Sequence, residues 1–371
     1  MTWQSRYHPS FIHPLLRMDV TRGFPLLSAP SMVFDNLQRF LGFLDLIHIA
    51  NLSKRCEILV QNSVKRCKKE TQVSVNMDRK SCSLKIRGQN RKSFTWESNV
   101  KIGYWDDEVF VDRRIGDLDW TFISFYGGYK SIKPLNLQDL LFWLKYVKTF
   151  WNFRISYLEL DFQEGEFPML LQETTLFHKA DQVHLSSVKL TQDQMTYLLD
   201  NVVTNDLYSL AKIQEEGFQY PKSISYDKLH LDADWITMEK LSDMMKTCRQ
   251  ITLFSRAFSN QEINSLLKSW LESNNTKLEF LYLTMTSEVR RAVPDLDYDE
   301  IFNGIECFEG SKKVVEGLDY FDPEIAYENG NDIQRNDGLW ATVILEQPKY
   351  YKCEMMFVVW HNQRFFDLVV E

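Results

Sequence analysis

One unit recurs in the middle of the chain: a three-residue strand pattern, a short loop and a capped helix. The strand patterns are Val183-His184-Leu185, Leu229-His230-Leu231 and Ile251-Thr252-Leu253. Six residues after each final Leu stands Thr or Ser, the residue types that cap helix N-termini. These cap positions are Thr191, Thr237 and Ser259. Gln194 and Glu262 stand where they complete a capping box with the first and third caps.

Apolar residues recur at helical spacing after these caps. The clearest series are Met195, Leu198, Leu199, Val202 and Val203, and Ile263, Leu266, Leu267, Trp270 and Leu271. A unit of one short strand and one helix cannot bury its own faces, so neighbouring units must stack. With flanking strand patterns at 158 and 281, the sequence predicts an α/β fold (α+β overall) with a degenerate leucine-rich-repeat-like array over residues 131–300.

The segments on either side of the array differ from it. Alternating strand-like runs fill much of residues 70–130, which we interpret as a β-rich connecting segment. A helical pattern returns at Leu137. After the array, Asn336-Asp337-Gly338 is a turn signal between strand-like runs. Residues 301–371 are therefore expected to form a C-terminal β-hairpin cap.

The sequence predicts a loose N-terminal arm over residues 1–21, followed by a helical module. One apolar stripe runs through Val33, Leu37, Phe40, Leu41 and Leu44. Asp45 is predicted to cap a second helix with the stripe Ile49, Leu52, Cys56, Leu59 and Val60. Such short helices are too few to enclose a core. Their apolar surface is expected to be covered either by a partner or by the rest of the chain.

Composition narrows the classes of function. The formal net charge of -8 and the absence of a long basic stripe argue against nucleic acid as a partner. The longest apolar run, residues 40–52, is too short for a membrane span. The six cysteines form no Cys-x-x-Cys pair, a pattern typical of reduced thiols in the cytoplasm. The basic run 65–69 suits a helix C-terminus, and a nuclear import patch is the alternative.

No catalytic or cofactor motif is visible, so we predict neither cofactor nor metal. Phosphate-cradling glycine loops and the common hydrolase and metalloprotease motifs are missing from the sequence. His184 and His230 occupy equivalent repeat positions, but a third metal ligand is not apparent. Asp295, Asp297 and Asp299 imitate a calcium loop in which Glu300 replaces the required Gly.

The N-terminal module resembles the F-box in the form common in the large nematode F-box family. The residues that carry this resemblance are Phe24-Pro25-Leu26-Leu27, the helix-opening Pro30, the stripe Val33, Leu37 and Leu41, Leu44-Asp45-Leu46, and Asn51 to Arg55. The F-box would span residues 22–69. The F-box usually has Leu before the helix-opening Pro, and here that position is Ala29.

Later segments resemble the F-box-associated domain of the same nematode proteins. These segments are Phe177 to Val183, Phe258 to Leu271, Ile333 to Gly338, and Ala341-Thr342-Val343. The resemblance implies a non-catalytic subunit of a ubiquitin ligase. Its F-box would bind a Skp-family adaptor, and through it a cullin, while the repeat region binds an unknown protein target.

The resemblance and strand alternation together give two sets of candidate site residues. The predicted adaptor-binding residues are Phe24, Pro25, Leu26, Pro30, Val33, Leu37, Leu41 and Leu44. Alternation predicts an exposed target-binding face made of Glu159, His184, Ser186, His230, Asp232, Thr252, Phe254, Tyr282 and Thr284. Two alternatives stay open: a protein-binding scaffold outside any ligase, whose F-box-like helices pack internally, and an enzyme with an unrecognised site.

Overall fold

The computed structural model divides the chain into two compact units, which are described separately. One unit takes in residues 1–73 and 83–153, and the other takes in residues 74–82 and 154–371. The structure describes residues 43–66, 71–77, 82–87, 93–97, 109–115, 118–125, 128–131, 137–150, 153–161, 177–186, 189–215, 217–232, 234–254, 258–286, 296–309, 313–314, 326–327, 330–349 and 352–361.

The first unit combines three described helices with antiparallel strands. The helices are α2 (Phe43–Asn51), α3 (Lys54–Arg66) and α4 (Leu137–Phe150). Strand β2 (Cys82–Arg87) pairs with β3 (Ser93–Glu97). A separate three-stranded sheet consists of β4 (Val109–Ile115), β5 (Leu118–Phe125) and β6 (Gly128–Ser131). The predicted strand-like runs and the helix at Leu137 are confirmed.

The break between the first two helices lies further along the chain than predicted. Asp45 does not cap a second helix, because it lies inside α2. The helix boundary falls at Leu52 and Ser53, where the Ser53 hydroxyl accepts a hydrogen bond from the Cys56 amide at 3.2 Å. Ser is a favoured N-cap residue, since its side-chain oxygen can accept from a backbone amide of the first helical turn.

Helices α2 and α3 bury one face inside their own unit. Helix α2 contacts α3 and strands β3 and β4, and α3 contacts α4. Ile47 and Val60 are fully covered, as are Trp143 and Leu144 on α4. The Tyr146 hydroxyl donates to the Asn51 side chain at 2.9 Å, which ties α4 to the end of α2.

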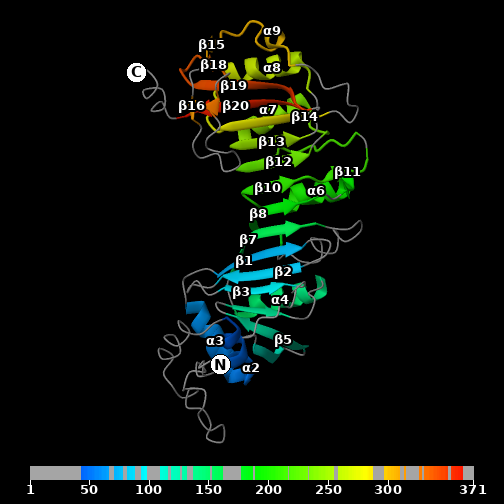
Figure 1. The fold of residues 1–371 in the computed structure, drawn as a ribbon, viewed down its shortest axis with the longest axis vertical. Helices are drawn as coiled ribbons and strands as arrows, with labels where there is room; N and C mark the ends of the chain where they lie inside the picture. Colours follow the sequence, from blue (N-terminus) through cyan, green and yellow to red (C-terminus); the bar gives the residue numbers. More distant parts are fainter. Residues whose placement is uncertain are drawn as a thin grey trace, which may run out of the picture. The chain divides into compact units, whose positions relative to one another are not determined.

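The second unit is built on one long sheet with the strand order β15-β18-β19-β20-β14-β13-β12-β10-β8-β7-β1 (Figure 1). The strands from β7 to β14 run parallel: β7 (Phe153–Leu160), β8 (Ala180–Leu185), β10 (Asp206–Ser209), β12 (Lys228–Asp232), β13 (Gln250–Phe254) and β14 (Phe280–Thr286). Residues from Ser74 onward in β1 (Thr71–Met77) lie beside β7.

Antiparallel strands extend the sheet beyond β14. They are β20 (Lys352–Trp360), β19 (Trp340–Lys349), β18 (Asn331–Gln334) and β15 (Phe308–Glu309). Two short strand pairs complete the described strands. They are β9 (Lys189–Leu190) with β11 (Lys212–Ile213), and β16 (Lys313–Val314) with β17 (Ala326–Tyr327). The predicted turn and the pairing of the last two strands are confirmed.

Three crossover helices follow the predicted caps: α6 (Gln192–Asn201), α7 (Met238–Thr247) and α8 (Asn260–Leu271). Both predicted capping boxes are present, at Thr191 with Gln194 and at Ser259 with Glu262. Right-handed crossovers between parallel strands place these helices on one side of the sheet. The prediction that the first helix continues to Val203 is wrong, since Val203 forms a bridge to Lys179 and is 65% exposed.

The core of the second unit lies between the sheet and these helices. Every strand from β8 to β14 points apolar side chains to that side, among them Val183, Leu207, Leu229, Ile251 and Leu281, which share one row of the register. These rows meet the buried helix residues Met195, Leu198, Leu241, Met244, Ile263 and Leu267. A short helix, α9 (Tyr298–Ile301), capped by Asp297, packs against α8.

Candidate functional site

The side of the sheet turned away from α6, α7 and α8 carries the predicted target residues, and we call it the open face. Side chains on a strand alternate between the two faces, so the register assigns them directly. One row across the strands consists of Glu159, His184, Tyr208, His230, Thr252 and Tyr282. The next row contains Asp232, Phe254 and Thr284. Ser186 comes directly after β8, two residues beyond His184, and so falls on the same face by alternation. All nine predicted residues therefore share one face.

Two tyrosines and two histidines form a column of rings across this face. Adjacent ring centroids lie 4.8 Å apart for Tyr157 and His184, 5.2 Å for His184 and Tyr208, and 5.6 Å for Tyr208 and His230. Parallel strands stand about 4.8 Å apart, so equivalent positions bring such rings into contact. We call Tyr157, His184, Tyr208 and His230 the ring column.

Hydrogen bonds fix one end of the ring column. The Tyr157 hydroxyl lies 3.1 Å from a Glu159 carboxylate oxygen and 3.4 Å from Nδ1 of His184. A hydroxyl carries one proton, so it donates to the carboxylate and accepts from the imidazole. The Asn76 amide on β1 also donates to Glu159. Glu159 is thus held by two neighbours and is not a free carboxylate.

Burial keeps the histidines of the ring column uncharged. Desolvation lowers the pKa of His184, while the carboxylates of Asp206 and Glu159 oppose this shift. Desolvation, with smaller contributions from the nearby His184 and Lys228, lowers the pKa of His230 to about 4. Near neutral pH the column is a polar, uncharged aromatic surface.

The metal alternative for the two histidines is not supported by this arrangement. His184 and His230 lie on β8 and β12 with β10 between them, which separates their backbones by roughly 10 Å. Among the described residues, no group of three or more His, Cys, Asp or Glu could hold a metal ion. Of the calcium-like series, Asp297 serves as the N-cap of α9, while Asp295 lies outside the described residues.

The prediction that all nine residues are exposed is wrong for four of them. Those buried are His230, Thr252, Tyr282 and Thr284. Tyr282 belongs to a second apolar cluster on the open face, where β14, β19 and β20 place Phe280, Tyr282, Ile344, Met356, Val358 and Trp360 against one another. The remaining five, Glu159, His184, Ser186, Asp232 and Phe254, are half-buried. Of the nine predicted residues, these five keep the most exposed surface.

The adaptor-binding prediction falls mostly outside the described residues. Phe24, Pro25, Leu26, Pro30, Val33, Leu37 and Leu41 lie there, and Leu44 is in α2. In the described part of the predicted F-box segment, two apolar side chains are solvent-exposed: Leu52 at 64% and Ile58 at 47%. Leu52 belongs to the predicted apolar stripe, and the described residues of the chain leave it uncovered.

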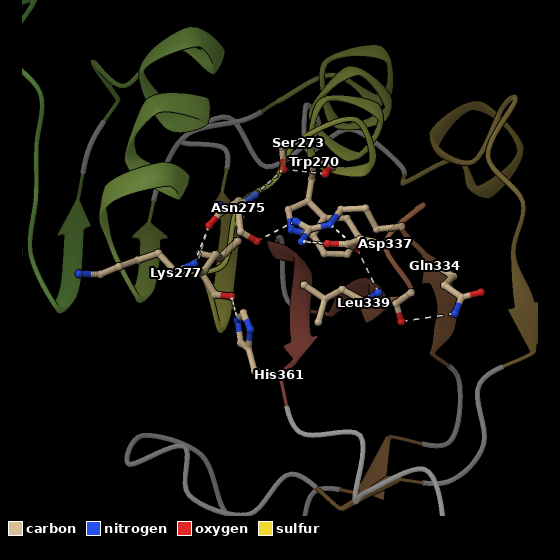
Figure 2. Close-up of polar contacts among 11 residues, drawn as sticks. Trp270, Ser273, Asn275, Lys277, Gln334, Asp337, Leu339 and His361 are labelled. Carbon is tan, nitrogen blue, oxygen red and sulfur yellow. Dashed lines mark hydrogen bonds and ion pairs between the residues drawn. The ribbon is translucent and has the colours of Figure 1, made fainter.

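A buried arginine organises the turn after β18, and sequence reasoning assigned it no role. Arg335 donates to both carboxylate oxygens of Asp337, at 2.9 and 2.6 Å, and to the backbone carbonyl of Asn275 at 2.7 Å. Its guanidinium carbon lies 5.3 Å from the ring centroid of Trp270 on α8. Figure 2 shows Asp337, Asn275 and Trp270 converging from three segments of the chain. The guanidinium holds the pKa of Asp337 at about 2.

Three residues of the open face were also missed: Asn76, Tyr157 and Tyr208. Tyr208 was overlooked because Leu207-Tyr208-Ser209 breaks the apolar-x-Leu pattern, and because no helix follows β10. Instead Phe218, Tyr220, Ile224 and Tyr226 fill that part of the helix-side core. The signal that could have found β10 is the similar spacing of Leu207 from Val183 and from Leu229, 24 and 22 residues.

Comparison with known proteins supports part of the resemblance. Residues 219–283 match the sequence family described as F-box associated, a segment that holds β12, α7, β13, α8 and most of β14. The Skn-1 dependent zygotic transcript 15 protein of Caenorhabditis elegans is 25% identical over an alignment of 174 positions that covers 43% of this chain. The chain spans about half of that relative, 46% of its length. No solved structure matched.

These findings bear out an F-box-associated domain, and the F-box itself stays a prediction. The matched segment lies in the middle of the second unit rather than at its C-terminal end. Among the helices that the structure describes, none has the length and apolar character of a membrane span.

Proposed function

We propose that the chain is a substrate-recruiting subunit of a Skp-cullin-F-box ubiquitin ligase. The observation that carries this proposal is the F-box-associated match at residues 219–283, which falls on the strands that form the open face. The residues of the first unit would bind the Skp-family adaptor, and the open face would bind a protein target. The chain would contribute proximity rather than a catalytic group.

Exposure in the first unit supports a docking role for the F-box segment. Leu52 and Ile58 together place two large apolar side chains in water where α2 ends and α3 begins. An adaptor that covers them would gain apolar burial of roughly 25 cal/mol per Å². The predicted adaptor residues Val33, Leu37, Leu41 and Leu44 would belong to the same contact.

The half-buried part of the open face is the proposed target surface. Glu159, His184 and Asp232 offer hydrogen-bonding groups there, and Phe254 offers an apolar edge. Stacked parallel strands give an extended surface of this kind for protein recognition. A target bound there would be held while the cullin-bound enzyme modifies it. Such complexes act in the cytoplasm and the nucleus, and we propose these locations.

A non-ligase scaffold is the second candidate, and one observation favours it. Helices α2 and α3 already pack on α4, β3 and β4, with Ile47 and Val60 fully covered. If the rest of the F-box segment were covered in the same way, no adaptor could reach it. The two candidates therefore differ in whether the folded chain binds a Skp-family adaptor.

Co-purification of the full chain with a Skp-family adaptor tests this difference. We compare wild type with the double substitution Leu52→Asp and Ile58→Asp, and with Leu37→Asp plus Leu41→Asp. Val203→Asp is the matched control, because Val203 is 65% exposed in the second unit. Replacing side chains that are already exposed costs little folding stability.

The ligase proposal expects wild type and the Val203→Asp control to retain the adaptor, while both double variants lose it. Circular dichroism and an unchanged thermal midpoint verify that the Leu52 and Ile58 variant is folded. A folded wild-type chain that fails to bind the adaptor would contradict the ligase proposal, and the scaffold would become the leading candidate.

A further inference from the structure

A cavity of about 410 Å³ lies at the edge of the sheet beyond the apolar cluster. Its lining residues are Glu306, Phe308, Gln334, Arg335, Asn336 and Gly338. They come from the segment around β15, from the end of β18 and from the turn that follows it. This volume is at the small end of the range for ligand pockets, so it suits one large side chain rather than a cofactor.

The turn that forms one wall is fixed by its own hydrogen bonds. The Arg335 amide donates to the Leu339 carbonyl at 2.9 Å, and the Gly338 amide donates to the Arg335 carbonyl at 2.8 Å. Gly338 has φ of 88°, a left-handed conformation that glycine adopts without strain. The Gln334 amide donates to the Gly338 carbonyl at 3.4 Å (Figure 2). A wall held in this way loses little entropy when a ligand binds.

The charges around the cavity favour a cation. The side chain of Arg335 is 2% exposed, and its donors are directed to Asp337 and Asn275, so it cannot serve an incoming anion. The negative charge of Asp337 is neutralised by its ion pair with Arg335. Glu306 is exposed and forms no ion pair or hydrogen bond with any residue that the structure describes. Among the described lining residues, Glu306 is therefore the one charged side chain without an ion-pair partner.

Phe308 supplies an apolar wall beside that charge. It is 41% exposed, and its ring meets Trp340 edge to face with centroids 5.3 Å apart. Lysine and arginine combine an aliphatic stem with a cationic end, and they commonly lay the stem on apolar surface. An aromatic face also attracts a cation directly. Phe308 and Glu306 both line the cavity, so Phe308 suits the aliphatic stem of such a side chain and Glu306 suits its cationic end.

The cavity lies on the same side of the sheet as the proposed target surface. The sheet register links Phe308 to β14 through one row of neighbouring positions. That row runs from Phe308 through Asp332, Thr342 and Val358 to Phe280. That row belongs to the open face, since Phe280 is two residues before Tyr282 on β14. A polypeptide that lies along the open face can reach the cavity without crossing the sheet.

We propose that this cavity binds a lysine or arginine side chain of the protein target. The stem packs on Phe308, and the cationic end pairs with Glu306. The turn at Arg335 to Gly338 forms the opposite wall. This inference rests on the proposed function, because it names the chemistry of the target that the open face receives.

Fluorescence polarisation with the full chain tests this inference. The probes are labelled degenerate peptide pools that share one fixed central residue: Lys, Arg, norleucine or Glu. Wild type should bind the Lys and Arg pools about three- to tenfold more tightly than the norleucine pool, as expected for one partly exposed charge-assisted contact. Glu306→Gln should reduce this preference to less than about twofold.

Matched variants separate charge from shape. Glu239→Gln removes an exposed carboxylate from α7, on the helix side, and should keep the full preference. Glu306→Lys should shift the preference to the Glu pool. Phe308→Ala should weaken the Lys and norleucine pools alike, because both share the aliphatic stem.

Binding that lacks a preference for Lys and Arg would overturn the inference, as would a preference that survives Glu306→Gln. Failure to bind any pool would overturn it too. Adaptor co-purification is measured on the same samples. Retained adaptor binding without a basic preference rejects only the cavity inference, whereas a basic preference without adaptor binding rejects only the ligase proposal.

Discussion

Replacing Arg335 should destabilise the second unit more than almost any other polar substitution. Its guanidinium is nearly fully buried and connects the turn after β18 to the loop between α8 and β14. In Arg335→Ala the Asn275 carbonyl loses a charge-assisted hydrogen bond, worth about 1.5–3 kcal/mol. The contact with the Trp270 ring adds roughly 0.5–2 kcal/mol. We expect a total loss of about 3 kcal/mol.

Urea unfolding followed by tryptophan fluorescence measures this loss. With a slope of about 3 kcal/mol per M, the midpoint should fall by about 1 M. Arg335→Lys is the informative comparison, because lysine keeps the charge but cannot present the planar fork to Asp337 and Asn275 together. It should lose an intermediate amount. A shift of Arg335→Ala below about 0.2 M, or an Arg335→Lys variant as unstable as Ala, would refute this reasoning.

Two further predictions concern pH and helix capping. The pKa of His230 in the folded chain, about 4, lies below the usual 6.5, so the unfolded chain takes up the proton first. Stability should therefore be complete above pH 6.5 and fall by about 3 kcal/mol toward pH 4. Urea titrations at several pH values should show this slope flattened in His230→Gln, and an unchanged slope would contradict the assignment. Ser259→Ala should cost about 1 kcal/mol, because the hydroxyl caps α8 at the Glu262 amide. Its thermal midpoint should fall below that of the control Ser265→Ala, and equal midpoints would argue against the cap.

Local chemistry explains what could be predicted from the sequence. Thr191, Thr237 and Ser259 were identifiable as caps because a cap depends on residues within one helical turn. The strand patterns around His184 and His230 were equally local, and their register follows from stacking of equivalent positions. The direction in which each candidate target residue points could therefore be predicted before its surroundings were known.

Burial could not be predicted in the same way, because it depends on distant segments. Thr252, Tyr282 and Thr284 are covered on a face whose apolar cluster includes side chains from β19 and β20. Those strands lie more than 50 residues further along the chain. Alternation reports the face of a strand but says nothing about what lies on it.

The role of Arg335 was hidden for a similar reason. The turn Asn336-Asp337-Gly338 was visible, and so was the helical stripe that contains Trp270. Only the fold brings the arginine next to Asn275, 60 residues away in sequence. A charged residue directly before a turn usually remains in water, so its burial was not expected.

The proposal that the chain brings a target to a ubiquitin ligase is tested most directly by ubiquitin transfer in a reconstituted reaction. The reaction contains the full chain, a Skp-family adaptor, a cullin and the remaining ligase components, and conjugates on the chain itself are measured. We predict conjugates that require the adaptor, disappear with Leu52→Asp plus Ile58→Asp, and persist with Val203→Asp. Transfer that is indifferent to the adaptor, or absent from a folded chain in the complete reaction, would contradict the proposal.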